Sequence, residues 1–209
     1  MHDDALWLRK AVVAASAAIY WASVLFQTRR VQKLIGRPPN VTPRSPKEKA
    51  LWAAWFSVVA GWVGQPFLIQ LQSASLGSFI PCLMHPATVF LGVVMVIGGY
   101  ACTLWCWAIM GEHWRMGVNK QEKTSLVRRG PYQWVRHPIY SFQIIILAGV
   151  FFLLPTLFSA ILLGTHLLCV VIKALDEESH LIQACGPDYA VYVSTTGRFF
   201  PKPSSLWRA

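Results

Sequence analysis

Residues 139–172 read IYSFQIIILAGVFFLLPTLFSAILLGTHLLCVVI, a stretch without a single Asp, Glu, Lys or Arg. As one helix, about 34 residues at ~1.5 Å each would reach ~50 Å. That length is well beyond the ~30 Å hydrocarbon core of a bilayer. The chain must therefore turn back near Pro155, and we expect two short membrane helices, at residues 139–154 and 156–172.

Three more apolar segments precede this hairpin, at residues 11–26, 51–71 and 88–110, and each approaches the ~20 residues that a spanning helix needs. The whole chain is 55% hydrophobic and only 13% charged, with ten Trp and a mean hydropathy of +0.43. These values lie outside the range of ordinary soluble domains. The sequence thus predicts an all-α integral membrane protein with about five transmembrane helices, the last two a short helical hairpin.

Basic residues concentrate in two segments between the apolar runs. Residues 29–49 hold seven Lys or Arg against one Glu, and residues 111–137 hold six against two Glu. Because excess positive charge marks cytoplasmic loops, we expect both segments and the C-terminal tail in the cytoplasm and the N-terminus outside. The same arrangement explains the net charge of +10 by membrane topology and argues against a nucleic-acid partner.

The cysteines could indicate disulfides or a metal site, and His166 could be a functional group within the membrane. The five cysteines include no CxxC pair, and Cys102 and Cys106 lie four apart inside an apolar run. We therefore expect neither a disulfide framework nor a metal site. His166 lies inside the predicted fifth span, where an ionisable side chain is a functional hypothesis; a neutral histidine bonded to a neighbouring helix is the plainer alternative.

A dense polar cluster, GPYQWVRHPIYSF, occupies residues 130–142 at the mouth of the hairpin. An Arg-His pair at the interface and a proline at the first helical position have an ordinary structural explanation. A second cluster follows the hairpin, and Lys173 and Glu177 in it are spaced to share one helix face. The hairpin brings both clusters together, which makes them the candidate site. The tail cluster consists of Lys173, Asp176, Glu177, Glu178, Gly186, Tyr189, Tyr192, Arg198 and Pro201.

Residues 125–140 (SLVRRGPYQWVRHPIY) and 177–201 (EESHLIQACGPDYAVYVSTTGRFFP) resemble the isoprenylcysteine carboxyl methyltransferase family and its phospholipid methyltransferase relatives. The shared pattern is Leu-Val, Gly-x-Tyr, Arg-His-Pro-x-Tyr, Glu-Glu, Gly-x-x-Tyr-x-x-Tyr and a late Pro. The resemblance implies one membrane methyltransferase domain over residues 1–209, with three spans in 1–110 and the catalytic region in 111–201. It also implies S-adenosylmethionine in a cytoplasmic pocket that a helical tail completes, and an acceptor that enters from the bilayer.

The resemblance also assigns roles to individual residues. Those expected to bind the cofactor are Leu126, Val127, Tyr132, His137, Pro138, Tyr140, Glu177 and Glu178. Those expected to bind the acceptor are Lys173, Tyr189 and Arg198, and Lys173 and Arg136 are expected to act in catalysis, with no metal. The expected reaction is methylation of a carboxylate on a lipid-linked acceptor, with membrane lipids as further partners and no obligate protein partner.

Two positions depart from the family pattern, and they leave the acceptor open. Phe142 stands where the family usually has Gly, and Lys173 replaces an Arg, which exchanges a bidentate fork for a point charge. A phospholipid amine or a small thiol is an alternative acceptor. A sterol-type reductase, with Arg128 and Arg129 near the phosphates of NADPH, and a non-catalytic membrane module are the alternative classes.

Overall fold

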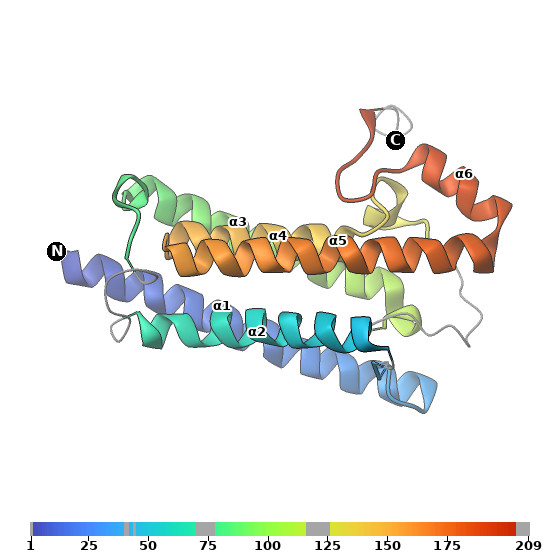
Figure 1. Cartoon of the computed structure of the whole chain (residues 1–209), viewed down its shortest axis with the longest axis horizontal. Coiled ribbons are helices and arrows are strands. Elements are labelled where there is room, and N and C mark those ends of the chain that lie inside the picture. Colours follow the sequence, from blue (N-terminus) through green and yellow to red (C-terminus); the bar gives the residue numbers. More distant parts are fainter. Residues whose placement is uncertain (1, 40–41, 44, 70–77, 116–125, 204–209) are drawn as a thin grey trace. The chain divides into compact units, whose positions relative to one another are not determined.

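The computed structural model describes residues 2–39, 42–43, 45–69, 78–115 and 126–203, and these residues form helices joined by short irregular segments (Figure 1). No strand is assigned within these ranges, where β-type pairing is limited to the single bridges Phe79–Thr156 and Val135–Gly197. The α-helices are α1 (His2–Ile35), α2 (Pro46–Leu68), α3 (Pro86–Met110), α4 (Pro138–Leu153), α5 (Leu157–Cys185) and α6 (Pro187–Thr195). The short 3-10 helices are η1 (Pro81–Leu83), η2 (Gly111–His113) and η3 (Gly130–Gln133).

Among the described residues, four helices are long and apolar enough to cross a membrane: Leu6–Ile35, Pro46–Leu68, Pro86–His113 and Leu157–Cys185. The chain is therefore a multi-pass membrane protein. The remaining predicted span, the fourth along the chain at residues 139–154, corresponds to α4, an apolar helix of 16 residues. At ~1.5 Å per residue its length is ~24 Å, somewhat less than the hydrocarbon core.

The predicted turn at Pro155 is confirmed, because α4 ends at Leu153 and α5 begins at Leu157. Thr156 starts α5 by accepting the backbone N–H of Ser159 on its hydroxyl at 3.1 Å, as an N-cap residue does. The carbonyl of Pro155 accepts the N–H of Ile80 at 2.8 Å. The polar backbone groups of this turn thus find partners although Leu154 and Thr156 are fully buried.

Two helix ends differ from the prediction. The first helix does not stop at Phe26 but continues to Ile35, and Arg29, Arg30 and Lys33 lie on it and not in a loop. Its extra turns bury Val31 completely, and Gly36, with φ of 71°, ends it. A left-handed glycine after the last turn is the usual C-terminal signal.

The predicted end of α5 at residue 172 is also wrong, and this arm of the hairpin is not short. The helix runs on for more than three turns to Cys185, so Glu177 and Glu178 lie within it and not at its end. Gly186, with φ of 52°, and Pro187 then stop it. Residues 116–125, in the second basic segment, lie outside the described residues.

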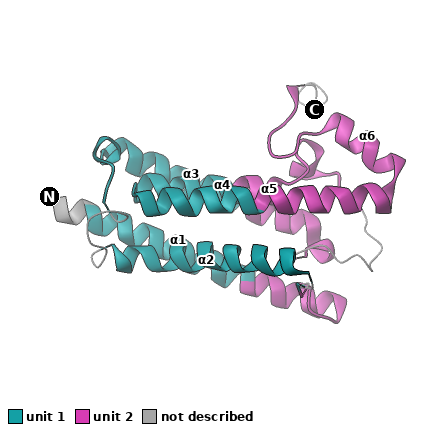
Figure 2. Cartoon of the chain, in the orientation of Figure 1, with its two compact units in different colours: residues 1–24, 43–101, 143–169 teal, residues 25–42, 102–142, 170–209 magenta. Residues whose placement is uncertain are grey.

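The chain forms two compact units (Figure 2). Unit 1 comprises residues 1–24, 43–101 and 143–169, and unit 2 comprises residues 25–42, 102–142 and 170–209. Four helices, α1, α3, α4 and α5, contribute a stretch to each unit. The polar clusters of the sequence lie in unit 2, whereas unit 1 consists mostly of apolar helix.

Unit 1 is held together by close helix contacts and by one buried cation. Gly92 of α3 and Gly149 of α4 face each other so closely that a Cβ on either would lie 2.8 Å from the other's carbonyl oxygen. The Arg9 guanidinium, 3% exposed, donates to the carbonyls of Leu153 at 3.0 Å and His85 at 3.0 Å. Arg9 thus satisfies a carbonyl in the last turn of α4 that lacks a helical partner.

We predict that Gly149→Ala lowers the free energy of unfolding by about 1–3 kcal/mol, the usual cost of overpacking. The carbonyl of Gly92 is backbone and cannot move away without shifting α3. Gly98→Ala on α3 is the matched control, because nothing lies within 4 Å of its added Cβ. It should be neutral or stabilise by up to about 1 kcal/mol. Thermal unfolding of both variants in detergent measures the difference, and equal midpoints would contradict the close contact.

Candidate active site

The polar cluster before α4 is fixed by backbone pairing with the tail. The N–H of Arg136 donates to the Gly197 carbonyl at 2.8 Å, that of His137 to the Arg198 carbonyl at 3.1 Å, and that of Gly197 to the Trp134 carbonyl at 3.0 Å. Gly197 is required sterically, since an added Cβ would lie 1.6 Å from the Phe200 carbonyl oxygen. Two segments about sixty residues apart in the sequence are therefore held in one register.

Glu178 of α5 is the centre of the site. Its Oε1 accepts from Arg136 Nε at 2.9 Å and Arg198 Nε at 3.0 Å, and it lies 3.2 Å from Nε2 of His137. Its Oε2 accepts from Arg198 Nη2 at 2.7 Å, so that Arg198 binds the carboxylate with two nitrogens. Such fork geometry is the stronger form of a charge-assisted hydrogen bond. Both oxygens of Glu178 are thus engaged by the protein itself.

Glu177, the neighbouring acid, has a more open environment. Its Oε1 accepts the Tyr140 hydroxyl at 2.5 Å, and its Oε2 lies 3.3 Å from Nδ1 of His137. The Glu177 side chain is 23% exposed, compared with 9% for Glu178. The rings of His137 and Tyr140 are stacked, with centroids 5.6 Å apart. Glu177 is therefore the carboxylate that a ligand can reach, beside two flat rings.

His137 bridges the two acids, with one ring nitrogen near each carboxylate. Burial of the ring opposes protonation, but the hydrogen bonds to Glu177 and Glu178 outweigh it and raise the pKa of His137 above its ordinary value. Only the protonated ring can donate from both nitrogens. The geometry and the direction of the pKa shift thus agree that the two carboxylates favour the protonated ring.

Three buried tyrosines, Tyr132, Tyr189 and Tyr192, belong to the same unit as the two acids. The Tyr192 hydroxyl on α6 donates to the Tyr132 carbonyl at 2.6 Å, which joins α6 to η3. Burial raises the pKa of Tyr132, and burial followed by the charge of Glu178 raises the pKa of Tyr189. Tyr189 is fully buried, and its hydroxyl has no hydrogen-bond partner within the described ranges. A buried orphan hydroxyl of this kind marks a place for a ligand or an ordered water.

The structure brings together most of the residues that the sequence predicts for the site. Arg136, His137, Tyr140, Glu177, Glu178 and Arg198 form one hydrogen-bonded group. Pro138 is the buried first residue of α4, and Lys173 is half-buried on α5, four residues before Glu177. Leu126 and Val127 are half-buried in the segment before η3.

Sequence reasoning missed the backbone partners of the site. Arg136 Nη1 donates to the Thr196 carbonyl at 2.6 Å, and the Ser141 hydroxyl donates to the Phe199 carbonyl at 2.7 Å. Carbonyl groups carry no signature in a sequence. Gly197 was the one residue whose type could have indicated this backbone pairing, since a glycine between polar residues and a Phe pair often marks a close backbone approach.

The fold and the site define a multi-pass membrane protein with a buried carboxylate–imidazole centre. The family model described as phospholipid methyltransferase matches residues 87–187. This part of the chain belongs to that family of membrane methyltransferases, which confirms the resemblance seen in the sequence. The matched region contains α3, α4 and α5, and with them His137, Glu177 and Glu178.

Two curated proteins are similar to this chain. One is the nickel-cobalt-cadmium resistance protein NccN of Alcaligenes xylosoxydans xylosoxydans, 28% identical over 119 residues, which are 57% of this chain and 50% of that protein. The other is the cobalt-zinc-cadmium resistance protein CzcN of Cupriavidus metallidurans, 24% identical over 125 residues, 60% of this chain and 54% of that protein. The similarity thus spans about half the length of these relatives.

We predict that Glu178→Gln lowers the free energy of unfolding by about 3 kcal/mol or more, because it leaves the side chains of Arg136 and Arg198 without their buried counter-charge. Glu112→Gln is the matched control, since the Glu112 side chain is 66% exposed. Chemical unfolding in detergent compares the two variants. If Glu178→Gln costs no more than the control, the ion cluster does not hold the tail.

A second prediction concerns pH. The raised pKa of His137 means that the folded state binds its proton more tightly than the unfolded state does. The resulting stability is fully present below the ordinary histidine pKa of ~6.5 and is lost as the pH rises through the folded-state pKa. We expect the free energy of unfolding to fall across this window by at most ~1.4 kcal/mol per pH unit. Replacement His137→Gln should remove that slope, and a slope that persists would assign it to another group.

Proposed function

We propose that this protein is an S-adenosylmethionine-dependent membrane methyltransferase that methylates a carboxylate of a lipid-linked acceptor. The observation that carries the proposal is the open carboxylate of Glu177 beside the stacked rings of His137 and Tyr140. The methyltransferase family match over residues 87–187 supports it. We assign the cofactor and the acceptor to one membrane domain over residues 1–209, with residues 111–201 as the catalytic region.

The residues of the site fit the chemistry of the cofactor. Glu177 offers a carboxylate to a cationic amino group or to ribose hydroxyls, and Tyr140 and His137 offer flat faces to a base. The orphan hydroxyl of Tyr189 provides a further polar contact within the buried region. Leu126 and Val127 add backbone groups and apolar surface, and Pro138 adds apolar surface. When bound, S-adenosylmethionine would supply an activated methyl group on a sulfonium.

The protein's part in such a reaction is positioning and the exclusion of water. Glu178 contacts the side chains of Arg136, His137 and Arg198, and these contacts fix their positions around one carboxylate. We call these four residues the ion cluster. Each oxygen of Glu177 has one partner among the described contacts, Tyr140 or His137, and the side chain is 23% exposed, so we propose that it accepts a further hydrogen bond from the ligand. We propose that Glu178 and Arg136 position the site residues through the ion cluster. Lys173 then binds the acceptor.

We further propose that the site faces the cytoplasm, with the N-terminus outside and the C-terminus inside. The proposal rests on the positive-inside rule and on the basic residues of segments 29–49 and 111–137. Membrane lipids and the lipid-linked acceptor are the proposed partners, and neither a nucleic acid nor an obligate protein partner is required.

A phospholipid amine is the second candidate acceptor, because the matching family model carries that description. The names of the two relatives connect proteins of similar sequence with metal resistance. A shared role would show as reduced growth of a deletion strain on nickel, cobalt, zinc or cadmium salts. Such a role concerns the biological setting of the methyl transfer and leaves the proposed site unchanged.

We predict that Glu177→Gln weakens S-adenosylmethionine binding by about 1–3 kcal/mol, the usual cost of removing a partner from a buried polar contact. Calorimetry of the full chain in detergent measures it, with S-adenosylhomocysteine and NADPH as comparison ligands. Gln183→Ala, an exposed position on the same helix, is the control and should bind normally. Binding of NADPH alone would replace the proposal with the reductase, and binding of none of the three would favour a non-catalytic module.

The acceptor is tested through Lys173. A carboxylate, with a pKa near ~4, is ionised at neutral pH and needs a cation but no base, whereas an amine near ~10 must first lose a proton. We expect Lys173→Ala to lower kcat/KM at least tenfold with cofactor affinity nearly unchanged, and Lys173→Arg to retain activity. The rate should be nearly flat from about pH 6 to 8. A rise of about tenfold per pH unit, or a silent Lys173→Ala, would favour the phospholipid amine.

A further inference from the structure

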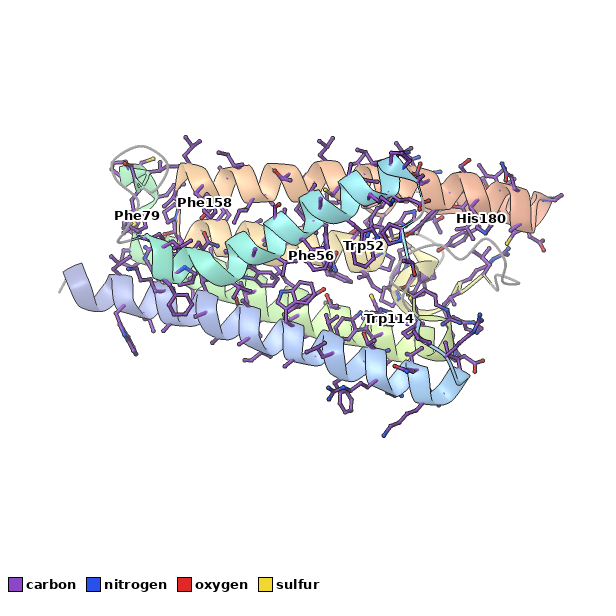
Figure 3. All side chains as sticks on the ribbon, turned by 60° about the horizontal axis from the view of Figure 1, so that its bottom comes forward. Trp52, Phe56, Phe79, Trp114, Phe158 and His180 are labelled. Atoms are coloured by element: carbon purple, nitrogen blue, oxygen red, sulfur yellow. The ribbon has the colours of Figure 1, made fainter. Side chains whose placement is uncertain are left out.

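The last turns of α1 carry a basic surface that the proposed methyl-transfer site does not use. Arg29, Arg30 and Lys33 are all exposed there, and all three belong to unit 2. Figure 3 shows side chains with nitrogen tips that project outwards from this end of α1. Within the described part of the chain, none of the three cations has a hydrogen bond or an ion pair with another residue.

Other cations of unit 2 are used within the protein. Arg136 and Arg198, for example, both bind the carboxylate of Glu178. Residues 25–42, in contrast, contain no Asp or Glu that could neutralise the cations of α1 locally. Three positive charges within two turns of helix therefore remain available to a partner outside the chain.

The three cations share one face of α1 with an exposed aromatic ring. At 3.6 residues per turn, Phe26, Arg29, Arg30 and Lys33 lie within about 100° of one another around the helix axis. Phe26 is 70% exposed, whereas Val31, on the opposite side of the helix, is fully buried. The outward face of this helix end is thus apolar at Phe26 and basic in the next two turns.

The length of α1 places this basic face at the membrane surface. The candidate span Leu6–Ile35 has 30 residues, which at ~1.5 Å each extend over ~45 Å. A bilayer is ~30 Å thick in its hydrocarbon core and about 40–45 Å thick with its headgroups. Residues 11–28 contain no charged side chain. The cations that follow them therefore lie at the level of the lipid headgroups, just beyond Phe26.

We infer that Arg29, Arg30 and Lys33 form a binding site for the phosphate of one anionic glycerophospholipid, whose acyl chain lies along Phe26. The two guanidinium groups match phosphate oxygens by their fork geometry, and Lys33 adds a point charge. A zwitterionic lipid fits less well, because its ammonium group is repelled by the same cations. A free phosphate offers the same oxygens but no chain for the exposed ring. The inference does not rest on the proposed methyl transfer.

The ordinary explanations of positive charge at this position do not account for its arrangement. The positive-inside rule and the helix dipole both favour cations near this end of α1. Both are satisfied by the number of charges alone. Neither requires that the cations share one outward face with an exposed Phe26, or that all three lack partners among the described residues. A bound anionic lipid explains both features.

Native mass spectrometry of the full chain in neutral detergent tests the site. The probes are phosphatidylglycerol and phosphatidylcholine with the same acyl chains, and glycerol 1-phosphate as a headgroup without chains. We expect one phosphatidylglycerol to bind at least about tenfold more tightly than phosphatidylcholine, because each cation near an anionic lipid contributes about fivefold. Raising the ammonium acetate concentration from about 0.1 M to 1 M should reduce this preference, since the Debye length falls from ~10 Å to ~3 Å. Equal binding of the two lipids, or equally tight binding of glycerol 1-phosphate, would overturn the inference.

Substitutions on α1 locate the site. Arg29→Gln and Arg30→Gln should each weaken phosphatidylglycerol binding about fivefold and leave phosphatidylcholine binding unchanged. The triple variant R29Q/R30Q/K33Q should bind both lipids equally. Lys49→Gln, which removes one exposed cation from α2, is the matched control and should keep the preference of the parent. A preference that survives in the triple variant would assign the lipid to another surface and overturn the inference.

Discussion

The carboxylate of Glu178 holds unit 2 together, because four nitrogen atoms from two arginines and one histidine surround it. Glu178 is 7% exposed, and the partners of its two oxygens come from the segment before α4 and from the tail. A buried carboxylate costs several kcal/mol in lost hydration unless its partners are well placed. The two arginines and His137 meet that requirement only when the tail has returned to the start of α4. The ion cluster is therefore complete only when the tail pairs with this segment at Gly197.

This arrangement explains how two adjacent glutamates take different roles. Glu178 is turned inward, where the arginines neutralise it, whereas Glu177 lies one position further round the helix and meets only Tyr140 and His137 among the contacts described above. His137 couples the two, since one of its ring nitrogens lies near each carboxylate. The charge of Glu177 remains directed towards the place that we assign to the cofactor.

Unit 1 relies on close helix packing and on a buried cation that pairs with backbone carbonyls. Gly92 and Gly149 let α3 and α4 approach closely, and Arg9 satisfies backbone carbonyls instead of carboxylates. The cavity of this unit, between α1, α2, α4 and α5, is lined mostly by aromatic rings and aliphatic side chains.

The sequence by itself determined the class of the fold and most members of the site. The lengths of the apolar runs predicted the membrane helices and the turn at Pro155, because a bilayer of fixed thickness limits helix length. The motif around His137 and the Glu177–Glu178 pair predicted the site and the methyltransferase family. The ends of α1 and α5 were missed, because Val31 and Glu178 are stabilised by tertiary partners that helix propensity does not register. Only the tertiary structure separated Glu177 from Glu178, placed the orphan hydroxyl of Tyr189 and assembled the cavity around Trp62. Each of these depends on contacts between segments far apart in the chain, which no local pattern encodes.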